Sequence, residues 1–371
     1  MLIGVPLEIK SQEYRVGLTP KSAQELINHG HQVLVQDQAG YGAGFENSDY
    51  EIAGAKIIKE ASEIFKDAEM IVKVKEPLLE EVEMLRENQI LFTYLHLAAA
   101  PELTASLMKS KAICIAYETV TDEHNRLPLL APMSAVAGRM SVQAGAHSLE
   151  KMQKGRGILL GGAPGVAPGN VLILGGGVVG ENAAIIATGM QATVSIVDKS
   201  FQRLKELKSI FGDAIIPLQS KDIDLSDHIK NCDLLIGSVL VPGANAPKLV
   251  SKEMIHSMKR GAVVVDVAID QGGCVETSKP TTHANPTYMV GDIVHYCVAN
   301  IPGSVPMTST LALNTVTLPF ILKLAQEGYK NALASDANFL AGLNVCQGKV
   351  TYKAVADDLG YEYIDASKVI N

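Results

Sequence analysis

The chain has 371 residues, enough for two domains that each bury a sizeable core. Its 32 Lys and Arg against 40 Asp and Glu give a formal net charge of −8 without a long basic run, and aromatic residues make up only 5%. Phosphate binding depends on clustered basic charge and base stacking on aromatic side chains, so these figures argue against nucleic acid as a partner.

The amino terminus, residues 1–6, resembles a strand and lacks the basic and apolar regions of a signal peptide. Residues 157–180 carry no charge, but nine of these 24 residues are Gly and two are Pro, too many for a membrane helix. The five cysteines are widely spaced and form no CxxC pair, which favours buried reduced thiols over disulfides or metal ligands. We therefore expect a cytoplasmic protein with no metal site and no membrane span.

Short apolar segments alternate with helical patterns from the start, as in parallel sheets built from β–α–β units. One helix is predicted to begin at Pro20, with Thr19 as its N-cap and Gly30 near its end, and another to run from Pro101 to about Lys109. Strands are predicted at residues 31–36, 70–75, 89–94 and 112–117. Together they make a complete α/β layer before residue 130.

A long helix is predicted from a Ser134 N-cap to about Lys151, followed by a second doubly wound unit. The strands of this unit are expected at residues 171–174, 193–197, 233–236 and 262–267. A second long helical pattern, from Thr308 to about Gly328, is apolar but contains Ser and Thr throughout, so we interpret it as a buried or bridging helix and not a membrane span.

The segment after that helix is too short for a core of its own, and we assign it to the first domain. The predicted fold class is α/β, with two doubly wound parallel-sheet domains linked by long helices. A discontinuous, flavodoxin-like substrate (catalytic) domain is expected at residues 1–130 with 307–371. A Rossmann domain for NAD is expected at residues 131–306.

Glycine is over-represented, at 32 of 371 residues or about 9% against a usual level of roughly 7%. The most informative glycines form the turn GGGVVG at 175–180, between a predicted strand and a helical pattern. In such a turn Gly175 permits the tight bend, Gly177 lets the backbone approach a pyrophosphate, and Gly180 lets helix and strand pack closely. The helix N-terminus then offers N–H groups to the phosphates, so the turn predicts a dinucleotide site.

The next strand ends at Asp198, 23 residues after Gly175. This is the spacing of the carboxylate that binds the hydroxyls of the adenosine ribose. Asp198 favours NAD over NADP, because a carboxylate repels a 2′-phosphate. Lys199 and Arg203 lie close by and weaken that preference.

Nine histidines are candidates for proton transfer, and most lie in helices, polar loops or capping contexts typical of surface or structural residues. His295 lies in the apolar segment IVHY, as expected of a core histidine with satisfied hydrogen bonds. His96 differs, because it follows the strand at 89–94 directly, at the end where open α/β sheets bind ligands.

Further ionisable groups follow other predicted strands. Lys75 stands at the corresponding end of the preceding strand, and Asp270 follows the strand at 262–267. Strand alternation places Lys73 and Lys75 on one face, which leaves a solvent-facing charge as the alternative for one of them. With His96 and Arg15, Lys75 and Asp270 form the predicted set of chemical residues.

The sequence also resembles a known family. Segments 92–98 (FTYLHLA), 132–134 (PMS) with 137–140 (AGRM), 175–180 and 265–273 (VDVAIDQGG) are similar to those of L-alanine dehydrogenases, as are the short segments 4–6, 8–10, 13–16 and 360–363. The resemblance covers essentially the whole chain. It implies NAD-dependent, reversible oxidative deamination of L-alanine to pyruvate and ammonia, and two α/β domains with the active site in the cleft between them, commonly in a homohexamer.

The resemblance also implies roles for single residues. Arg15 and Lys75 match the substrate-binding pair, and His96 and Asp270 match the catalytic acid–base pair. The positions expected to line the NAD site are Ser134, Val178, Val179, Asp198, Arg203, Ser220, Val239, Leu240, Val267, Asp270 and Asn300. Two residues depart from the family's pattern: Met307 stands where arginine is usual and Ala135 where glutamate is frequent.

The chemistry agrees with these roles. A guanidinium binds a carboxylate bidentately, and an ammonium polarises a keto oxygen. Loss of hydride from the alanine Cα gives an iminium that water must attack, which needs a group that exchanges protons near neutral pH, such as the His96 imidazole. Asp270 would position the water and stabilise the cation, and which of the two residues takes which proton stays open.

Two other functions fit the glycine turn. The NAD-binding subunit of a proton-translocating transhydrogenase shares this fold and parts of these motifs, but it does not oxidise an amino acid. A non-catalytic NAD-binding module would keep residues 175–180 and have little need of Arg15, Lys75 and His96. Retention of that set favours the dehydrogenase.

Overall fold

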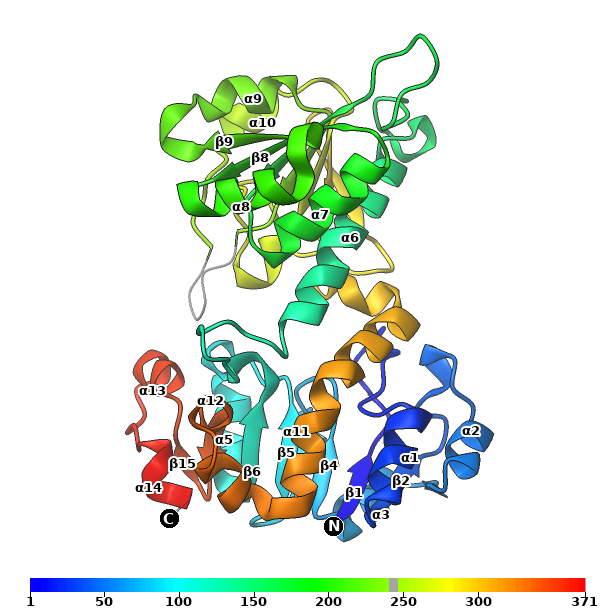
Figure 1. The fold of residues 1–371 in the computed structure, drawn as a ribbon, viewed down its shortest axis with the longest axis vertical. Coiled ribbons are helices and arrows are strands. Elements are labelled where there is room, and N and C mark those ends of the chain that lie inside the picture. The colour runs from blue at the N-terminus through cyan, green and yellow to red at the C-terminus, as the bar shows by residue number, and fades with distance from the viewer. Residues whose placement is uncertain (240–245, 371) are drawn as a thin grey trace. The chain divides into compact units, whose positions relative to one another are not determined.

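The computed structural model describes residues 1–239 and 246–370. The chain forms two compact units, unit 1 with Met1–Pro132 and Val305–Asn371, and unit 2 with Met133–Ser304. Each unit contains one mostly parallel sheet with helices packed against it (Figure 1). The predicted α/β fold class is therefore confirmed.

Unit 1 is built on an eight-stranded sheet in the order β15-β14-β6-β5-β4-β1-β2-β3. Strands β1 to β6 are parallel, whereas β14 runs antiparallel to both β6 and β15. The four strands predicted after the first are confirmed as β2, β4, β5 and β6, and β4 ends three residues earlier than expected. The bounds are β1 (Leu2–Val5), β2 (Gln32–Gln36), β3 (Lys56–Ile58), β4 (Met70–Val72), β5 (Ile90–Thr93), β6 (Ile113–Ala116), β14 (Leu343–Cys346) and β15 (Lys349–Val350).

The helices of unit 1 begin where their sequence signals predict. Helix α1 starts at Pro20, and the Thr19 hydroxyl accepts a hydrogen bond from the N–H of Ser22, which confirms the predicted N-cap. Helix α5 starts at Pro101, as expected. The bounds are α1 (Pro20–Asn28), α2 (Asn47–Ile52), α3 (Ala61–Asp67), α4 (Leu79–Val82), α5 (Pro101–Ser110), α11 (Pro306–Ala334), α12 (Ala337–Leu340), α13 (Lys353–Leu359) and α14 (Ala366–Ile370).

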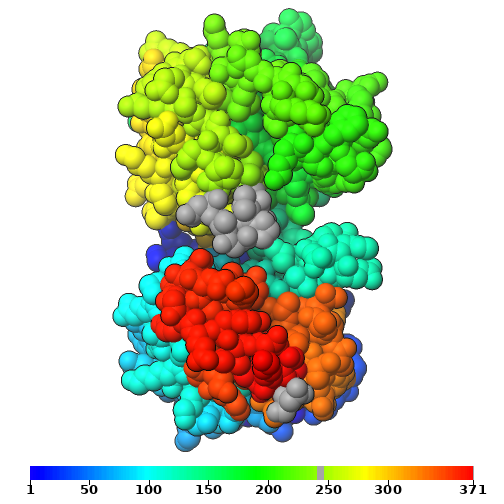
Figure 2. Space-filling view, turned by 90° about the vertical axis from the view of Figure 1, so that its left-hand side faces the viewer, coloured from blue at the N-terminus to red at the C-terminus, as the bar shows by residue number. Residues whose placement is uncertain are grey.

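Helix α11 is the predicted apolar helix, and its backbone breaks at Gly328, where φ is +72°. By length and composition alone it is the one helix of the described residues that could cross a membrane, a test that core helices also pass. Its buried Asn314 accepts a hydrogen bond from the N–H of Thr19 at 2.8 Å and donates one to the Gly17 carbonyl at 3.1 Å. The helix thus packs into unit 1 as a core helix, and Figure 2 shows the red C-terminal residues beside its orange segment.

Unit 2 is built on a seven-stranded sheet in the order β12-β13-β11-β10-β7-β8-β9, parallel except for β12. Alternate residues of a strand point into different clusters, because Val171 and Ile173 pack on one side of the sheet and Leu172 and Leu174 on the other. Its strands are β7 (Asn170–Leu174), β8 (Thr193–Asp198), β9 (Ile215–Gln219), β10 (Leu234–Gly237), β11 (Val263–Asp266), β12 (Thr287–Val290) and β13 (Ile293–Tyr296).

The helices near this sheet include one whose start was predicted wrongly. Helix α6 begins at Ala131, so Ser134 lies in its first turn and is not the N-cap. The helix tolerates Pro132 because the first-turn N–H groups have no partner within the helix. The bounds are α6 (Ala131–Ser148), α7 (Val178–Gly189), α8 (Phe201–Phe211), α9 (Leu225–Asn231) and α10 (Lys252–Ser257).

The cysteines and His295 are buried in the cores, as the sequence predicted. All five cysteines are buried and free, as predicted for reduced thiols. His295, on β13, is fully buried, and its Nε2 shares a hydrogen bond of 2.8 Å with the Thr277 hydroxyl, so it is the predicted core histidine.

Burial lowers the pKa of His295 to about 4, from an ordinary value of 6.5. The unfolded chain therefore takes up a proton first on acidification, and stability is lost as the pH falls from 6.5 towards 4. The loss at pH 5 is about 2 kcal/mol. We expect His295→Gln to lose less thermal stability than the parent between pH 7 and pH 5, as measured by circular dichroism melting. Equal losses in the two proteins would contradict this assignment.

Candidate functional site

The glycine turn of unit 2 connects β7 to α7 and requires glycine at two positions. Gly175 has φ +99°, and a β-carbon there would lie 3.0 Å from the Ser238 carbonyl oxygen. A β-carbon at Gly180 would overlap the Gly175 carbonyl oxygen, so helix and strand approach too closely for any side chain. Gly177, the N-cap of α7, has no atom within 4 Å of such a β-carbon, so the fold itself does not demand glycine there.

Two charged side chains hold the middle of this turn. Asp198, at the end of β8, accepts hydrogen bonds from the N–H of Gly176 and the N–H of Ser200, each at 2.7 Å. Arg203 donates from Nε to the Gly176 carbonyl at 2.7 Å and pairs with Glu181 and, at 3.1 Å, with Glu206. Because two carboxylates face Arg203, it supplies little of the positive potential that a 2′-phosphate would need.

The other residues expected around the cofactor follow the strands of the same sheet. Ser220 begins the 3-10 helix η6 (Ser220–Asp222) after β9, Val239 follows β10, and Val267 begins η7 (Val267–Gln271) after β11. Because β7 to β11 are parallel, their carboxyl ends share one edge of the sheet. Val178 and Val179 lie in the first turn of α7, and Ser134 lies in α6. Leu240 lies outside the described residues.

Asp270 is exposed on η7, and a buried carboxylate holds that short helix in place. Asp266, with no exposed surface, accepts hydrogen bonds from the N–H groups of Ala268 at 3.2 Å, Val275 at 3.1 Å and Cys274 at 3.4 Å. Both ends of the loop that carries Asp270 are thereby tied to one side chain. Asn300 has φ +68°, and its carbonyl is hydrogen-bonded to the His283 ring at 3.1 Å.

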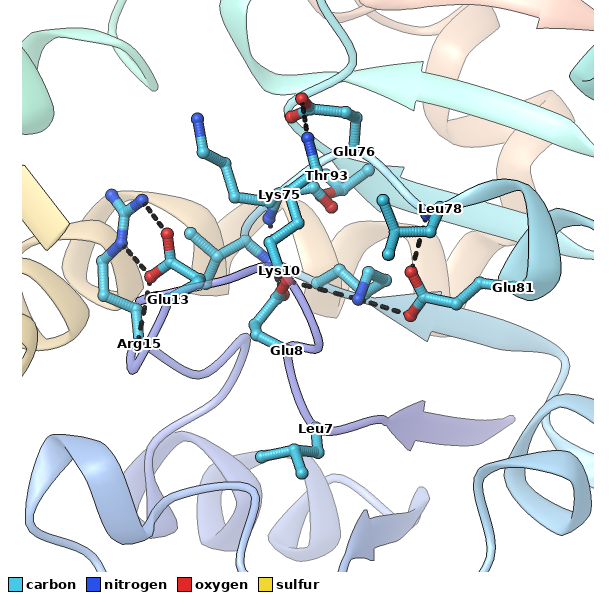
Figure 3. Close-up of polar contacts among 12 residues, drawn as sticks. Leu7, Glu8, Lys10, Glu13, Arg15, Lys75, Glu76, Leu78, Glu81 and Thr93 are labelled. Atoms are coloured by element: carbon cyan, nitrogen blue, oxygen red, sulfur yellow. Dashed lines mark hydrogen bonds and ion pairs between the residues drawn. The ribbon is translucent and has the colours of Figure 1, made fainter. Parts of the chain in front are cut away.

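In unit 1 the three predicted residues follow neighbouring strands. Lys75 follows β4, His96 follows β5, and Arg15 lies in the segment after β1, with the strands in the order β5-β4-β1. The Thr93 hydroxyl donates a hydrogen bond to the Lys75 carbonyl at 2.9 Å. Within the described residues the Lys75 ammonium makes no hydrogen bond or ion pair, and Figure 3 draws no contact at its end.

Arg15 is almost fully buried and is held by Glu13. Glu13 accepts hydrogen bonds from Nε of Arg15 at 2.7 Å and from Nη2 at 2.6 Å, a bidentate arrangement shown in Figure 3. Burial by itself lowers the pKa of Arg15, but the bonds to Glu13 outweigh it and the net shift is upward. The guanidinium is therefore charged and fixed in direction.

Lys73 is not a solvent-facing charge, the alternative left by strand alternation. Its side chain is 1% exposed, and its ammonium lies 2.7 Å from Glu81 and 3.2 Å from Glu8. Burial lowers the pKa of Lys73, but the two carboxylates outweigh it and the net direction is upward. Glu8 also accepts the N–H of Val74 at 2.6 Å, so the buried ion network fixes the backbone that leads to Lys75 (Figure 3).

His96 has a left-handed backbone, with φ +50° and ψ +42°, where residues other than glycine are strained. Its N–H donates to Glu118 Oε1 at 2.7 Å, and its Nδ1 lies 3.8 Å from the same oxygen. The imidazole lies parallel to the ring of Tyr94 at a centroid distance of 5.9 Å. It is about half exposed, so one side remains accessible to a small molecule.

Sequence reasoning missed the residues that support these groups. They are Glu8, Glu13, Glu118, Tyr94 and Asp266, and Lys73 was considered only as an alternative solvent-facing charge. Glu13 alone had a visible signal, because it stands two residues before Arg15. Of the two departures noted above, Met307 is exposed near the start of α11, and Ala135 lies in α6.

Comparisons with known proteins give a consistent result. The family model of the alanine dehydrogenase/PNT N-terminal domain matches residues 4–137, and that of the C-terminal domain matches residues 141–353. An alanine dehydrogenase of Halomonas elongata is 57% identical over 370 residues, covering 100% of both chains. One of Bacillus subtilis is 55% identical, covering 100% of this chain and 98% of the relative.

Solved structures agree. A structure named L-alanine dehydrogenase matches with a TM-score of 0.94 and 52% identity, covering 97% of this chain and 99% of its own. A transhydrogenase from Sinorhizobium meliloti matches with a TM-score of 0.82 but only 22% identity, covering 95% and 100%. The second likeness concerns the fold alone.

The two glycines of the turn give a matched pair of variants. We expect Gly180→Ala to lower stability by about 1–3 kcal/mol, because its β-carbon overlaps the Gly175 carbonyl. Gly177→Ala should leave stability nearly unchanged and weaken NADH binding about tenfold or more, because its methyl group enters the space that a pyrophosphate needs. Thermal melting and NADH fluorescence titration measure the two effects. Unchanged NADH affinity in Gly177→Ala would contradict the assignment of this turn to the cofactor.

Proposed function

The chain belongs to the alanine dehydrogenase family, and from this premise we propose that it catalyses the reversible oxidative deamination of L-alanine to pyruvate and ammonia with NAD. The observation that carries the proposal is the identity of 57% and 55%, over the whole chain, to relatives named for this activity. The transhydrogenase alternative is supported by a likeness of fold only, at 22% identity.

The glycine turn fits a nicotinamide dinucleotide. Gly175 and Gly180 let the strand and α7 approach each other closely, Gly177 leaves open space at the turn, and the N-terminus of α7 lies beside it. Asp198 would bind the adenosine ribose, and the neutralisation of Arg203 by Glu181 supports NAD over NADP. When bound, the nicotinamide supplies the acceptor for the hydride of the alanine Cα.

Arg15 and Lys75 bind the substrate. Arg15 carries a permanent charge whose direction is set by Glu13, and it would bind the carboxylate of alanine or pyruvate. Lys75 stands on a backbone fixed by Glu8 and Thr93, so its ammonium is available to polarise the keto oxygen of pyruvate. Holding the carboxylate and the carbonyl at once orients the substrate carbon that reacts.

His96 and Asp270 handle the protons. Water must lose a proton as it adds to the iminium formed from alanine, and His96 would take it, since its imidazole is half exposed. Asp270, held by the Asp266-capped loop, would orient that water and stabilise the cationic intermediate. In the reverse direction the same groups return protons as ammonia adds to pyruvate.

We assign the protein to the cytoplasm as a homohexamer, an assembly that follows from the family resemblance. We propose no nucleic acid or membrane partner, in keeping with the net charge of −8 and the polar contacts of α11 within unit 1. Analytical ultracentrifugation would test the hexamer directly.

The activity is tested by alanine-dependent formation of NADH. We expect absorbance at 340 nm to rise with L-alanine and NAD, and much less with glycine, L-serine or NADP. Pyruvate, ammonia and NADH should drive the reverse reaction. Failure to form NADH with any amino acid would overturn the enzyme assignment and favour a non-catalytic NAD-binding protein.

The role of His96 is tested by His96→Ala. Loss of the proton-transferring group should lower kcat by about 10²–10⁴-fold. NADH affinity should stay within about twofold of the parent, because the predicted cofactor residues lie in unit 2. Steady-state kinetics and fluorescence titration separate the two effects. Near-normal turnover would remove His96 from the mechanism.

A further inference from the structure

We infer that Glu118 is the positioning residue for His96, an assignment that rests on the proposed function. Glu118 lies on the 3-10 helix η3 (Tyr117–Thr119), which follows β6. Strands β5 and β6 are parallel neighbours, with Thr93 paired to Ala116, so the segments that follow them emerge together. This brings Glu118 next to His96 although 22 residues separate them in the sequence.

Both carboxylate oxygens of Glu118 face the backbone that carries His96. Oε1 accepts the N–H of His96 at 2.7 Å and that of Leu95 at 3.1 Å, and Oε2 lies 3.2 Å from the latter. The Glu118 side chain is 13% exposed, so these bonds are shielded from competing water. One side chain thus satisfies two consecutive backbone donors, an arrangement that defines a sharp turn.

This turn places His96 in the left-handed region. A residue other than glycine pays about 1–2 kcal/mol for that conformation, and it persists only where surrounding contacts require it. With an extended backbone at His96, the Cα–Cβ bond would point elsewhere and the imidazole would leave the strand end. The two bonds to Glu118 therefore select the conformer in which the imidazole faces outward.

Glu118 also orients the ring itself. Its Oε1 lies 3.8 Å from Nδ1 of His96, so the Nδ1 edge of the imidazole faces the carboxylate and Nε2, on the other side of the ring, faces away from it. Tyr94 covers one face of the imidazole, and its own hydroxyl is fixed by donating to the Leu129 carbonyl at 2.6 Å. Carboxylate and ring together leave Nε2 as the nitrogen directed at the substrate.

The test compares Glu118→Ala, Glu118→Gln and His96→Ala, singly and combined. Glu118→Ala removes both backbone bonds, whereas Glu118→Gln keeps an oxygen that can accept them. We expect kcat to fall about 10- to 30-fold in Glu118→Ala, with NADH affinity unchanged, and to stay within about threefold of the parent in Glu118→Gln. Glu123→Gln, an exposed glutamate beside His124, is the control and should keep parental kinetics.

The decisive measurement is the double variant Glu118→Ala/His96→Ala. If Glu118 acts through His96, adding Glu118→Ala to His96→Ala changes the residual kcat by less than about twofold, because the group it positions is already absent. If Glu118→Ala lowered kcat by the same factor in the parent and in His96→Ala, Glu118 would have a general structural role and the inference would be overturned. A parental kcat in the single variant Glu118→Ala would also overturn it. Near-parental turnover in His96→Ala would overturn the inference together with the role of His96. The proposed function fails only if the parent itself forms no NADH.

Discussion

The chemistry of this protein depends on one constraint, that parallel strands end at the same edge of their sheet. In unit 1 the neighbouring strands β5, β4 and β1 lead to His96, Lys75 and the segment that carries Arg15. In unit 2 the strands β7 to β11 lead to the glycine turn, Asp198 and the helix that carries Asp270. Backbone hydrogen bonds between the strands fix where each strand ends. Residues that are far apart in the sequence therefore lie at the same edge of the sheet.

The buried charged groups near this edge of unit 1 are stabilised by partners of opposite charge. Arg15 has Glu13, and Lys73 has both Glu8 and Glu81. Removing one member of a buried pair leaves an uncompensated charge and costs about 3–5 kcal/mol. These pairs do more than neutralise charge, because Glu8 also binds the backbone next to Lys75. The buried ion network of Lys73, Glu8 and Glu81 therefore also fixes the position of the backbone that carries Lys75.

Local patterns predicted most of the elements on which the site is built. The strands before Lys75, His96 and Asp270 were identified from apolar runs, and Thr19 from its capping signal. The start of α6 was predicted too late, because Ser134 is a typical N-cap residue but lies inside the first turn of this helix. Strands β14 and β15 were not predicted, because both are short and β14 joins the sheet by pairing with β6, more than 200 residues away in the sequence. Pairing at that distance leaves no periodic signal.

The sequence by itself determined which chemical groups exist and which local turn carries each of them. The glycines at 175–180 dictate a turn into a helix, and an apolar run that ends before a charged residue dictates a strand end, because both depend on backbone geometry within a few residues. Only the tertiary structure decided which groups support one another. Glu118 meets His96 because β6 lies beside β5, and Glu8 meets Lys73 because β1 lies beside β4. The order of the strands depends on how the whole unit buries both faces of its sheet, and no short segment of the sequence carries that information.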